Sequence, residues 1–498
     1  MKTFHFTAIL LAIASSSLSA QDFKSHLRGT ELTFEVSGTA SSGDYAPLWL
    51  TSNRYGLGSV EPYSNYERAR VERDIRLDAD LNWRLGYGLD LALAFGHERR
   101  GIVQQAYVEG AWKKLRLTLG AKQQPMEAQN AELSSGALSL GINGRPIPQV
   151  RLDIDQFSFP GTKGWWKWKL YASYGWMTDG RWQQKWAEPN TRYARHVLYH
   201  EKALYWDFGR ADIFPLTFGI GLRMATTFGG TSYNVKTSRS EGTVYKHDSG
   251  LKAYWQALTA QGSDATDGTD PNVAGNHLGS WLLQLRYHGK AWKAKAYFER
   301  FFEDHSMLTL QYGIRDMLIG GEVSVPSNPF VSTAVLEYLS TTNQSGAVFH
   351  DPTKTLPDQI AGRDNYYNHL NYSGWQNYGL TLGNPLITSP LYNGAFGVGH
   401  QLHFMNNRVK AWHVGLSGDP SSEWHWRLLV SFTRNWGTYD VPLSDVLRQN
   451  SALAEVTYRP RFAPGWGAKA GLALDRGKLL GNSFGGQLTI SKQLTLVK

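Results

Sequence analysis

Apolar and polar residues alternate along most of the chain with a period of two, which is typical of β-strands. In residues 166–176, Trp, Leu, Ala and Tyr residues alternate with Lys, Tyr, Ser and Gly. Residues 71–85 show the same pattern with a strongly charged face, which predicts a long strand there, followed by a turn at 86–88. Further strands are predicted around residues 89–95, 115–119, 216–224, 281–287, 292–298, 424–432 and 488–496.

The length of these stretches favours a membrane barrel. Many have about ten residues or more, whereas strands of soluble proteins usually have five or six. Aromatic residues lie at the strand ends, as at Trp165, Trp176, Tyr287 and Trp436. Outer-membrane barrels have apolar residues toward lipid, polar residues toward the lumen and aromatic girdles at both interfaces. We therefore predict an all-β fold, a transmembrane antiparallel β-barrel of the outer membrane with about 16–18 strands.

The charged face of the predicted strand at 71–85 fits two architectures. In a barrel, Asp74, Arg76, Asp78 and Asp80 would point into a water-filled lumen. In a soluble β-sandwich the same side chains would face bulk water. Strand length favours the barrel, and a closed barrel also leaves no strand edge unpaired.

The first twenty residues are typical of a secretory signal peptide. Lys2 supplies the positive charge, residues 4–13 form a short apolar segment, and residues 14–20 are mostly small and polar. No later stretch approaches the roughly 20 apolar residues that a membrane-spanning helix needs. We expect a signal peptide over residues 1–20, a barrel domain over residues 21–498 and export to the cell outer membrane.

Composition and charge restrict the partners. The 498-residue chain has no cysteine, which excludes disulfides, thiolate metal sites and cysteine nucleophiles. Its formal net charge is +9. Dense runs of Lys or Arg are absent, so nucleic acid is not expected. The positive balance favours an acidic polymer, although a mildly basic surface without a charged partner explains it as well.

The sequence contains only incomplete motifs for catalysis and metal binding. His200-Glu201 begins a zinc-protease pattern, but Leu204 stands where the second His is required. The acidic residues with a histidine at 303–305 and the three Asp residues within 264–270 are better explained as solvated strand ends and loops. We therefore expect no enzyme activity, no cofactor and no metal.

Three long stretches lack the strand pattern, at 123–149, 231–276 and 341–399, and we expect them on the extracellular side. The last contains the run DNYYNHLNYSGWQN at 364–377, in which aromatic rings could stack on sugars and amides could bind their hydroxyls. The alternative is a Tyr-rich loop that fills the lumen. The predicted polysaccharide-binding residues are Asp364, Asn365, Tyr366, Tyr367, Asn368, His369, Asn371, Tyr372, Trp375, Gln376 and Tyr378.

Four segments together resemble the Wzi-type capsule-assembly outer-membrane proteins in the form found in Bacteroidetes. They are Ala46–Ser59, Leu117–Pro125, Gly136–Val150 and Tyr366–Pro390, and their order extends over most of the mature chain. The resemblance implies a monomeric barrel of about eighteen strands with loops and short helices in the lumen. It also implies a lectin-like role, which is to hold capsular or exopolysaccharide at the cell surface.

This resemblance and the aromatic–amide loop lead to one hypothesis and one alternative. The hypothesis is a non-enzymatic outer-membrane anchor or assembly factor for capsular polysaccharide or exopolysaccharide, surrounded by outer-membrane lipid. The alternative is a porin that passes oligosaccharides or other solutes through an open lumen.

Overall fold

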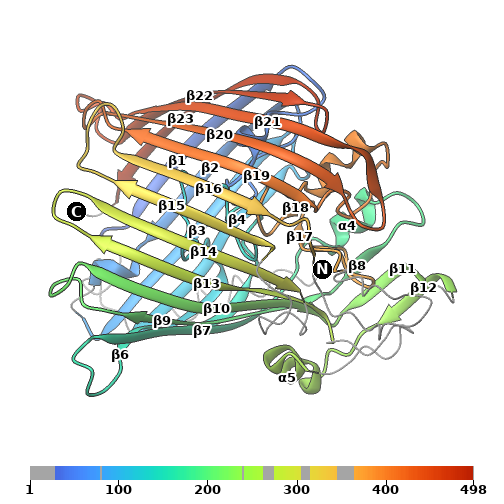
Figure 1. Ribbon diagram of the computed structural model, residues 1–498, viewed down its shortest axis with the longest axis horizontal. Helices are drawn as coiled ribbons and strands as arrows, with labels where there is room; N and C mark the ends of the chain where they lie inside the picture. Colours follow the sequence, from blue (N-terminus) through green and yellow to red (C-terminus); the bar gives the residue numbers. More distant parts are fainter. Residues whose placement is uncertain are drawn as a thin grey trace.

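The computed structural model describes residues 28–78, 81–237, 240–261, 274–303, 315–344 and 364–496. Eighteen of the described strands form one closed antiparallel barrel (Figure 1), which confirms the predicted fold class. The barrel strands are β1 (Glu31–Ser41), β2 (Tyr63–Arg73), β3 (Trp83–Phe95), β4 (Gly101–Trp112), β5 (Leu115–Ala121), β6 (Gln149–Ser158), β7 (Trp166–Trp176), β9 (Leu198–Phe208), β10 (Leu216–Phe228), β13 (Asn276–His288), β14 (Lys293–Glu303), β15 (Met317–Ser324), β16 (Thr333–Ser340), β19 (Val409–Gly418), β20 (Trp424–Gly437), β21 (Pro442–Tyr458), β22 (Trp466–Gly477) and β23 (Ser483–Thr495).

The first and last strands close the barrel. Glu31 of β1 lies opposite Thr495 of β23, and the register runs without a shift to Ser41 opposite Gly485. The start of β1 and the end of β23 therefore lie at the same end of the barrel, which we call the turn end. The long connections leave from the other end, the loop end, where Figure 1 shows α4 (Gly180–Trp186), α5 (Leu251–Thr259) and the short strands β8 (Tyr193–Arg195), β11 (Thr231–Thr237) and β12 (Ser240–Lys246).

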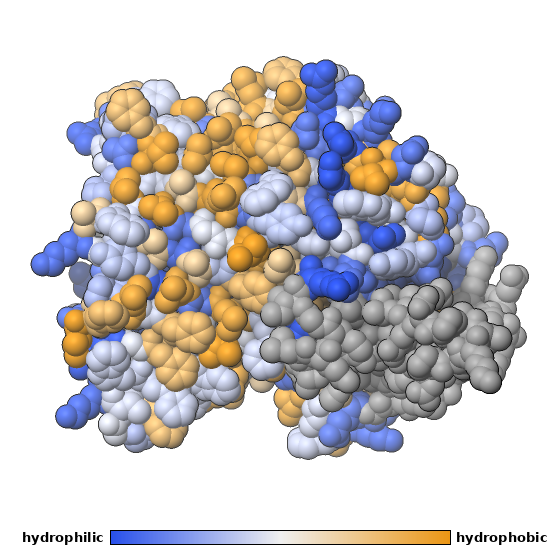
Figure 2. Space-filling model, in the orientation of Figure 1, coloured by the Kyte–Doolittle hydropathy of each residue, from blue (hydrophilic) through white to orange (hydrophobic). Residues whose placement is uncertain are grey.

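Strand β3 shows how the alternating sequence builds the wall. Leu89, Leu91 and Leu93 are 43–62% exposed and face outward, whereas Asp90 and Ala92 are buried on the inner side. Inside, Asp90 Oδ1 accepts a hydrogen bond of 2.8 Å from Arg68 Nε on β2. Figure 2 shows apolar side chains gathered over the strands. Apolar residues outward and polar residues inward are the arrangement that a barrel in lipid requires.

The prediction of one long strand over residues 71–85 is wrong. Strand β2 ends at Arg73, the 3₁₀-helix η1 (Ile75–Asp78) follows, and β3 begins at Trp83. Asp74 ends the strand because its Oδ1 accepts the backbone N–H of Arg76 at 2.8 Å. Asp74, Arg76 and Asp78 thus lie in the turn between β2 and β3 and not on a strand of the wall, although Asp74 and Arg76 border a cavity in the lumen. Asp80 lies outside the described residues.

Gly86 and Gly88 lie inside β3 and not in the predicted turn. A Cβ on Gly88 would lie only 2.4 Å from the ring of Tyr107 on β4. A Cβ on Gly86 would lie 3.0 Å from Cβ of Ile75 in η1. These glycines therefore make room for neighbouring side chains. From the sequence alone, a glycine in this role cannot be distinguished from a glycine in a turn.

Loops fill the lumen, as the resemblance implied. One buried apolar core contains Leu48, Trp49 and Leu50 of α3 (Leu48–Thr51), residues of the 122–148 segment and residues of the 364–408 segment, packed against inward side chains of the wall. We call the two longer segments together the plug. The plug contains β17 (Gln376–Asn377), β18 (Leu380–Thr381) and the 3₁₀-helix η3 (Pro390–Phe396).

The stretch at 231–276, which lacks the strand pattern in the sequence, nevertheless contains β11, β12 and α5. Among the described residues, no helix is both long enough and apolar enough to cross a membrane. The proposed signal peptide at 1–20, the Asp residues at 264–270, and Asp304 and His305 lie outside the described residues.

Candidate functional site

Most of the predicted sugar-binding residues are buried inside the barrel. Tyr366, Tyr367 and Trp375 are fully buried, with 0% of their surface exposed. Of the other predicted residues, Asp364, Asn365 and His369 are partly exposed, whereas Asn368, Asn371, Tyr372, Gln376 and Tyr378 are buried. The expectation that these aromatic rings form open stacking surfaces is therefore wrong for the buried ones. Tyr366, Tyr367 and Trp375 pack in the lumen core, and Tyr372 and Tyr378 pack in two smaller buried clusters.

The polar atoms of the buried rings have partners within the chain. Tyr366 donates from its hydroxyl to Asp316 Oδ2 at 3.0 Å. Trp375 donates from Nε1 to the carbonyl oxygen of Ser139 at 2.7 Å, and Tyr367 donates its hydroxyl proton to the carbonyl of Leu138. Burial and the nearby carboxylate of Asp316 raise the pKa of the Tyr366 phenol, so it stays a neutral donor. These contacts fit the alternative of a lumen-filling loop.

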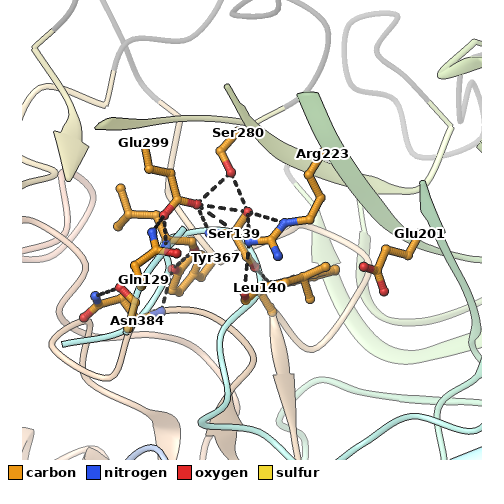
Figure 3. Close-up of polar contacts among 12 residues, drawn as sticks. Gln129, Ser139, Leu140, Glu201, Arg223, Ser280, Glu299, Tyr367 and Asn384 are labelled. Atoms are coloured by element: carbon orange, nitrogen blue, oxygen red, sulfur yellow. Dashed lines mark hydrogen bonds and ion pairs between the residues drawn. The ribbon is translucent and has the colours of Figure 1, made fainter. Parts of the chain in front are cut away.

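Carboxylates on the barrel wall hold the plug (Figure 3). Glu299 on β14 is fully buried and accepts the backbone N–H of Leu138 at 2.9 Å and that of Ser139 at 3.1 Å. Gln129 Nε2 and Ser280 Oγ donate to the same carboxylate, at 2.8 and 2.7 Å. A buried carboxylate with this many donors is well compensated for its lost hydration.

Arg223 on β10 extends this cluster. Its Nη2 donates to Ser139 Oγ and to the carbonyl of Leu140, both at 2.9 Å. The same Nη2 lies 3.9 Å from Glu299 Oε1. One cation and one anion of the wall thus bind opposite backbone groups of the same plug turn, which fixes its position in the lumen (Figure 3).

The same arrangement recurs around the wall. Glu337 on β16 accepts the backbone N–H of Ser135 at 2.7 Å, and Asp475 on β22 accepts that of Leu48 at 3.0 Å. His413 on β19 bonds through Nε2 to the carbonyl of Leu133 at 2.8 Å. The sequence analysis predicted no strand at Glu337, His413 or Asp475, and it could not identify their partners in loops more than a hundred residues away.

A cavity of about 380 Å³ remains in the lumen beside the plug. It extends to Asp74 and Arg76 in the β2–β3 turn, so it opens toward the turn end. Its walls carry paired charges, such as Arg151 with Asp153 at 3.0 Å. Plug residues 140–147 and Leu382 bound the cavity.

At the loop end, aromatic rings form a surface that sequence analysis missed. Trp186 of α4 is partly exposed and stacks on His400, with ring centroids 4.7 Å apart and an interplanar angle of 18°. It also stacks on Trp182, with ring centroids 5.1 Å apart. Tyr193 of β8 and Tyr233 of β11 stack nearly parallel at 4.7 Å. We call Trp186, His400, Tyr193 and Tyr233 the aromatic platform.

The predicted segment supports this platform from below. Trp186 and Tyr193 both pack against a small buried cluster of Trp182, Tyr378 and Leu402. Tyr378 thus contributes to the platform as part of its base.

Asp179, which precedes α4, connects this helix to the predicted segment. Its Oδ2 accepts the backbone N–H of Tyr378 at 3.1 Å and Nε2 of Gln376 at 3.2 Å. Burial raises the pKa of the Asp179 carboxyl, and the hydrogen bonds from Gln183, Tyr378 and Gln376 oppose this shift.

The surroundings of the platform are basic. Residues 180–195 contain four Arg or Lys residues and a single acidic residue, Glu188. Arg99 is exposed and donates from Nη1 to the hydroxyl of Tyr378 at 3.0 Å. The signal was present in the sequence, because residues 179–190 read DGRWQQKWAEPN and mix aromatic, amide and charged residues as 364–377 does.

Within the part of the chain that the structure describes, no group of three or more His, Asp or Glu side chains is placed to hold a metal ion. The platform offers flat rings, amides and cations, which suit the binding of a hydroxyl-rich, negatively charged ligand.

No protein-family model matches this sequence, and no curated protein matches it. The structure is similar to that of Wzi, an outer membrane protein involved in group 1 capsule assembly in Escherichia coli and a carbohydrate-binding β-barrel. The identity is 13%, the match covers 98% of this chain and 92% of Wzi, and the TM-score is 0.57. This chain has the outer-membrane β-barrel fold.

Two other matches are Pseudomonas aeruginosa proteins. OprD matches with 10% identity over 94% of this chain and 96% of its own, at a TM-score of 0.44. OccK11 matches with 10% identity over 93% of this chain and 95% of its own, at a TM-score of 0.45.

Proposed function

We propose that this protein is a non-enzymatic barrel of the cell outer membrane that holds capsular polysaccharide or exopolysaccharide at the cell surface. The observation that carries the proposal is the aromatic platform at the loop end, above a lumen that the plug fills. Long loops of outer-membrane barrels face the exterior, so the platform faces the medium. The likeness to Wzi supports the same role, and the resemblance to the Bacteroidetes form of that family belongs to this proposal.

The proposed ligand is an acidic polysaccharide. Sugar rings have apolar faces that stack on Trp186, Tyr193 and Tyr233, and the Arg and Lys residues of 180–195 attract carboxylates or other anionic groups. Weak contacts repeated along one polymer give avidity without a tight single site. Asp364, Asn365 and His369, which are partly exposed, are proposed to contact the polymer beside the platform, and the buried members of the predicted segment to support it.

The test is to delete the gene and measure polysaccharide in the cell-bound fraction and in the medium. We expect unchanged total polymer with a shift into the medium, restored by the wild-type gene but not by a W186A/Y233A variant. Normal amounts in both fractions after deletion would contradict the proposal.

A channel is the second candidate, because the lumen retains a charged cavity that opens at the turn end. Plug residues such as Leu140, Ile147 and Leu382 line this cavity, which favours the anchor. Single-channel recording of the purified protein in a planar bilayer discriminates the two. We expect no stable conductance, whereas steady solute-dependent currents would favour the channel.

A further inference from the structure

Helix α5 lies outside the barrel wall, beside the loop end (Figure 1). Its Tyr254 packs against Tyr174 of β7, with ring centroids 5.0 Å apart, and against Phe228 of β10 at 5.3 Å. Tyr174 is on the outward row of β7, since its neighbour Ser173 is buried on the lumen side and Trp176 on its own row is 51% exposed. The helix therefore covers part of the outer surface, where lipid would otherwise lie.

The inner face of α5 satisfies polar groups that would be costly in lipid. Lys202 belongs to the outward row of β9, because it lies opposite Ala172 and Met224 on the neighbouring strands. A charged side chain on the lipid face of a barrel is destabilising. Lys202 Nζ instead donates to the carbonyl oxygens of Ala257 and Leu258 at the end of α5, where the helix dipole is negative.

The outer face of α5 is apolar and exposed. Leu251 is 90% exposed and Trp255 is 62% exposed. These residues and Leu258 are spaced at i, i+4 and i+7, so they lie on one side of the helix. The opposite side carries Ala253 and Ala257, which are buried against Phe228.

This stripe lies at the loop-end margin of the apolar belt of the barrel. On the adjacent strands, Trp176 at the loop end and Phe208 and Phe218 near the turn end face outward with 39–51% of their surfaces exposed. Trp176 lies at the loop end of β7, at the position of an aromatic girdle residue. Lys252, next to Leu251, is exposed and can reach anionic head groups.

We propose that α5 is an interfacial helix whose Leu251, Trp255 and Leu258 insert into the outer leaflet of the membrane at the head-group boundary. A second copy of this chain is the weaker occupant, since a stable interface needs about 800 Å² per partner and three side chains on one short helix supply far less. The proposal rests on the outer-membrane location proposed above.

The absence of cysteine gives a direct test, because one introduced cysteine is the only thiol in the chain. Trp255→Cys, Phe218→Cys and Gln184→Cys are each labelled with a polarity-sensitive fluorophore in the full chain. Each is then reconstituted at high lipid excess into phosphatidylcholine vesicles with brominated acyl chains. Phe218 reports the belt, and Gln184, which is exposed on α4, reports the aqueous face.

We expect the label at 255 to be quenched at least twofold by bromines placed near the head groups, less by deep bromines, and little by aqueous iodide. The label at 184 should respond to iodide alone. If the label at 218 is quenched by bromines while the label at 255 is quenched only by iodide, α5 faces water. The interfacial-helix proposal then fails, while the proposed membrane location stands. If bromines do not quench the label at 218 either, the proposed outer-membrane location fails together with the interfacial-helix proposal. Disulfide-linked dimers of unlabelled W255C in vesicles would show that a second copy covers the stripe, which also overturns the proposal.

Discussion

Trp186 stacks on His400 with ring centroids 4.7 Å apart, although the two residues come from loops in different halves of the chain. Two hydrogen bonds from backbone N–H groups also join the two loops next to the stacked rings. The N–H of Glu188 donates to the carbonyl of His400 at 3.0 Å, and the N–H of His400 donates to Glu188 Oε1 at 3.3 Å. The ring of Trp186 is therefore held in place before any ligand arrives, which lowers the entropy lost on binding.

Replacing Trp186 by Ala should weaken binding of acidic polysaccharide by about 1–2 kcal/mol, a factor of roughly 5–30. The ring is partly exposed, so its loss removes a stacking surface without opening the core. Binding of the purified protein to immobilised polymer measures the effect. Trp424→Ala is the matched control, because that Trp lies at the start of β20, at the turn end. Equal binding of W186A and W424A would remove the platform from the proposal.

Glu299→Ala should release the 122–148 segment from the wall. The substitution leaves the N–H groups of Leu138 and Ser139 without their acceptor and Arg223 without its nearby anion. Removal of one partner from a buried charged pair costs about 3–5 kcal/mol. We expect faster proteolysis of this segment and new conductance in a planar bilayer. Glu299→Gln retains one acceptor oxygen but no charge and should show a smaller effect than Glu299→Ala, so wild-type behaviour of E299Q would refute the role of the charge.

Trp375→Ala should lower stability by about 3–5 kcal/mol, the range for removing a fully buried large aromatic ring. The indole is 0% exposed and donates to Ser139, so its loss creates a cavity and an unpaired carbonyl. The temperature at which the folded barrel loses its faster migration in detergent gels reports the change. Should W375A melt like the wild type but fail to bind polymer, the ring acts on the ligand and not on the plug.

Asp179 makes the platform sensitive to pH. Because burial raises the pKa of its carboxyl, the folded protein binds a proton more tightly than the unfolded chain does. Between the unfolded pKa of about 3.9 and the raised folded value, stability therefore falls as pH rises. Asp179→Asn cannot titrate, so the stability of the wild type relative to D179N should decline as pH increases from 4. Thermal unfolding of both proteins between pH 4 and 7 tests this, and parallel curves would contradict it.

The sequence by itself determined the class of fold. Alternation with a period of two is local, since each residue faces outward or inward according to its position in its own strand. The leucines of β3, the tryptophans of β7 and the polar residues between them could thus be assigned from their neighbours alone. The mix of aromatic and amide residues also drew attention to 364–378 as an unusual loop.

Only the tertiary structure decided where that loop lies. Inside the barrel, Tyr366 donates to Asp316, which directly precedes β15, and Trp375 donates to Ser139 of the 122–148 segment. No local sequence pattern encodes such distant partners. The same holds for Gly88 inside β3, which is a glycine because the Tyr107 ring on β4 occupies the space of a Cβ. The platform likewise needs Trp186 and His400 to be brought together by the closed barrel, since stacking depends on contacts in space and not on spacing along the chain.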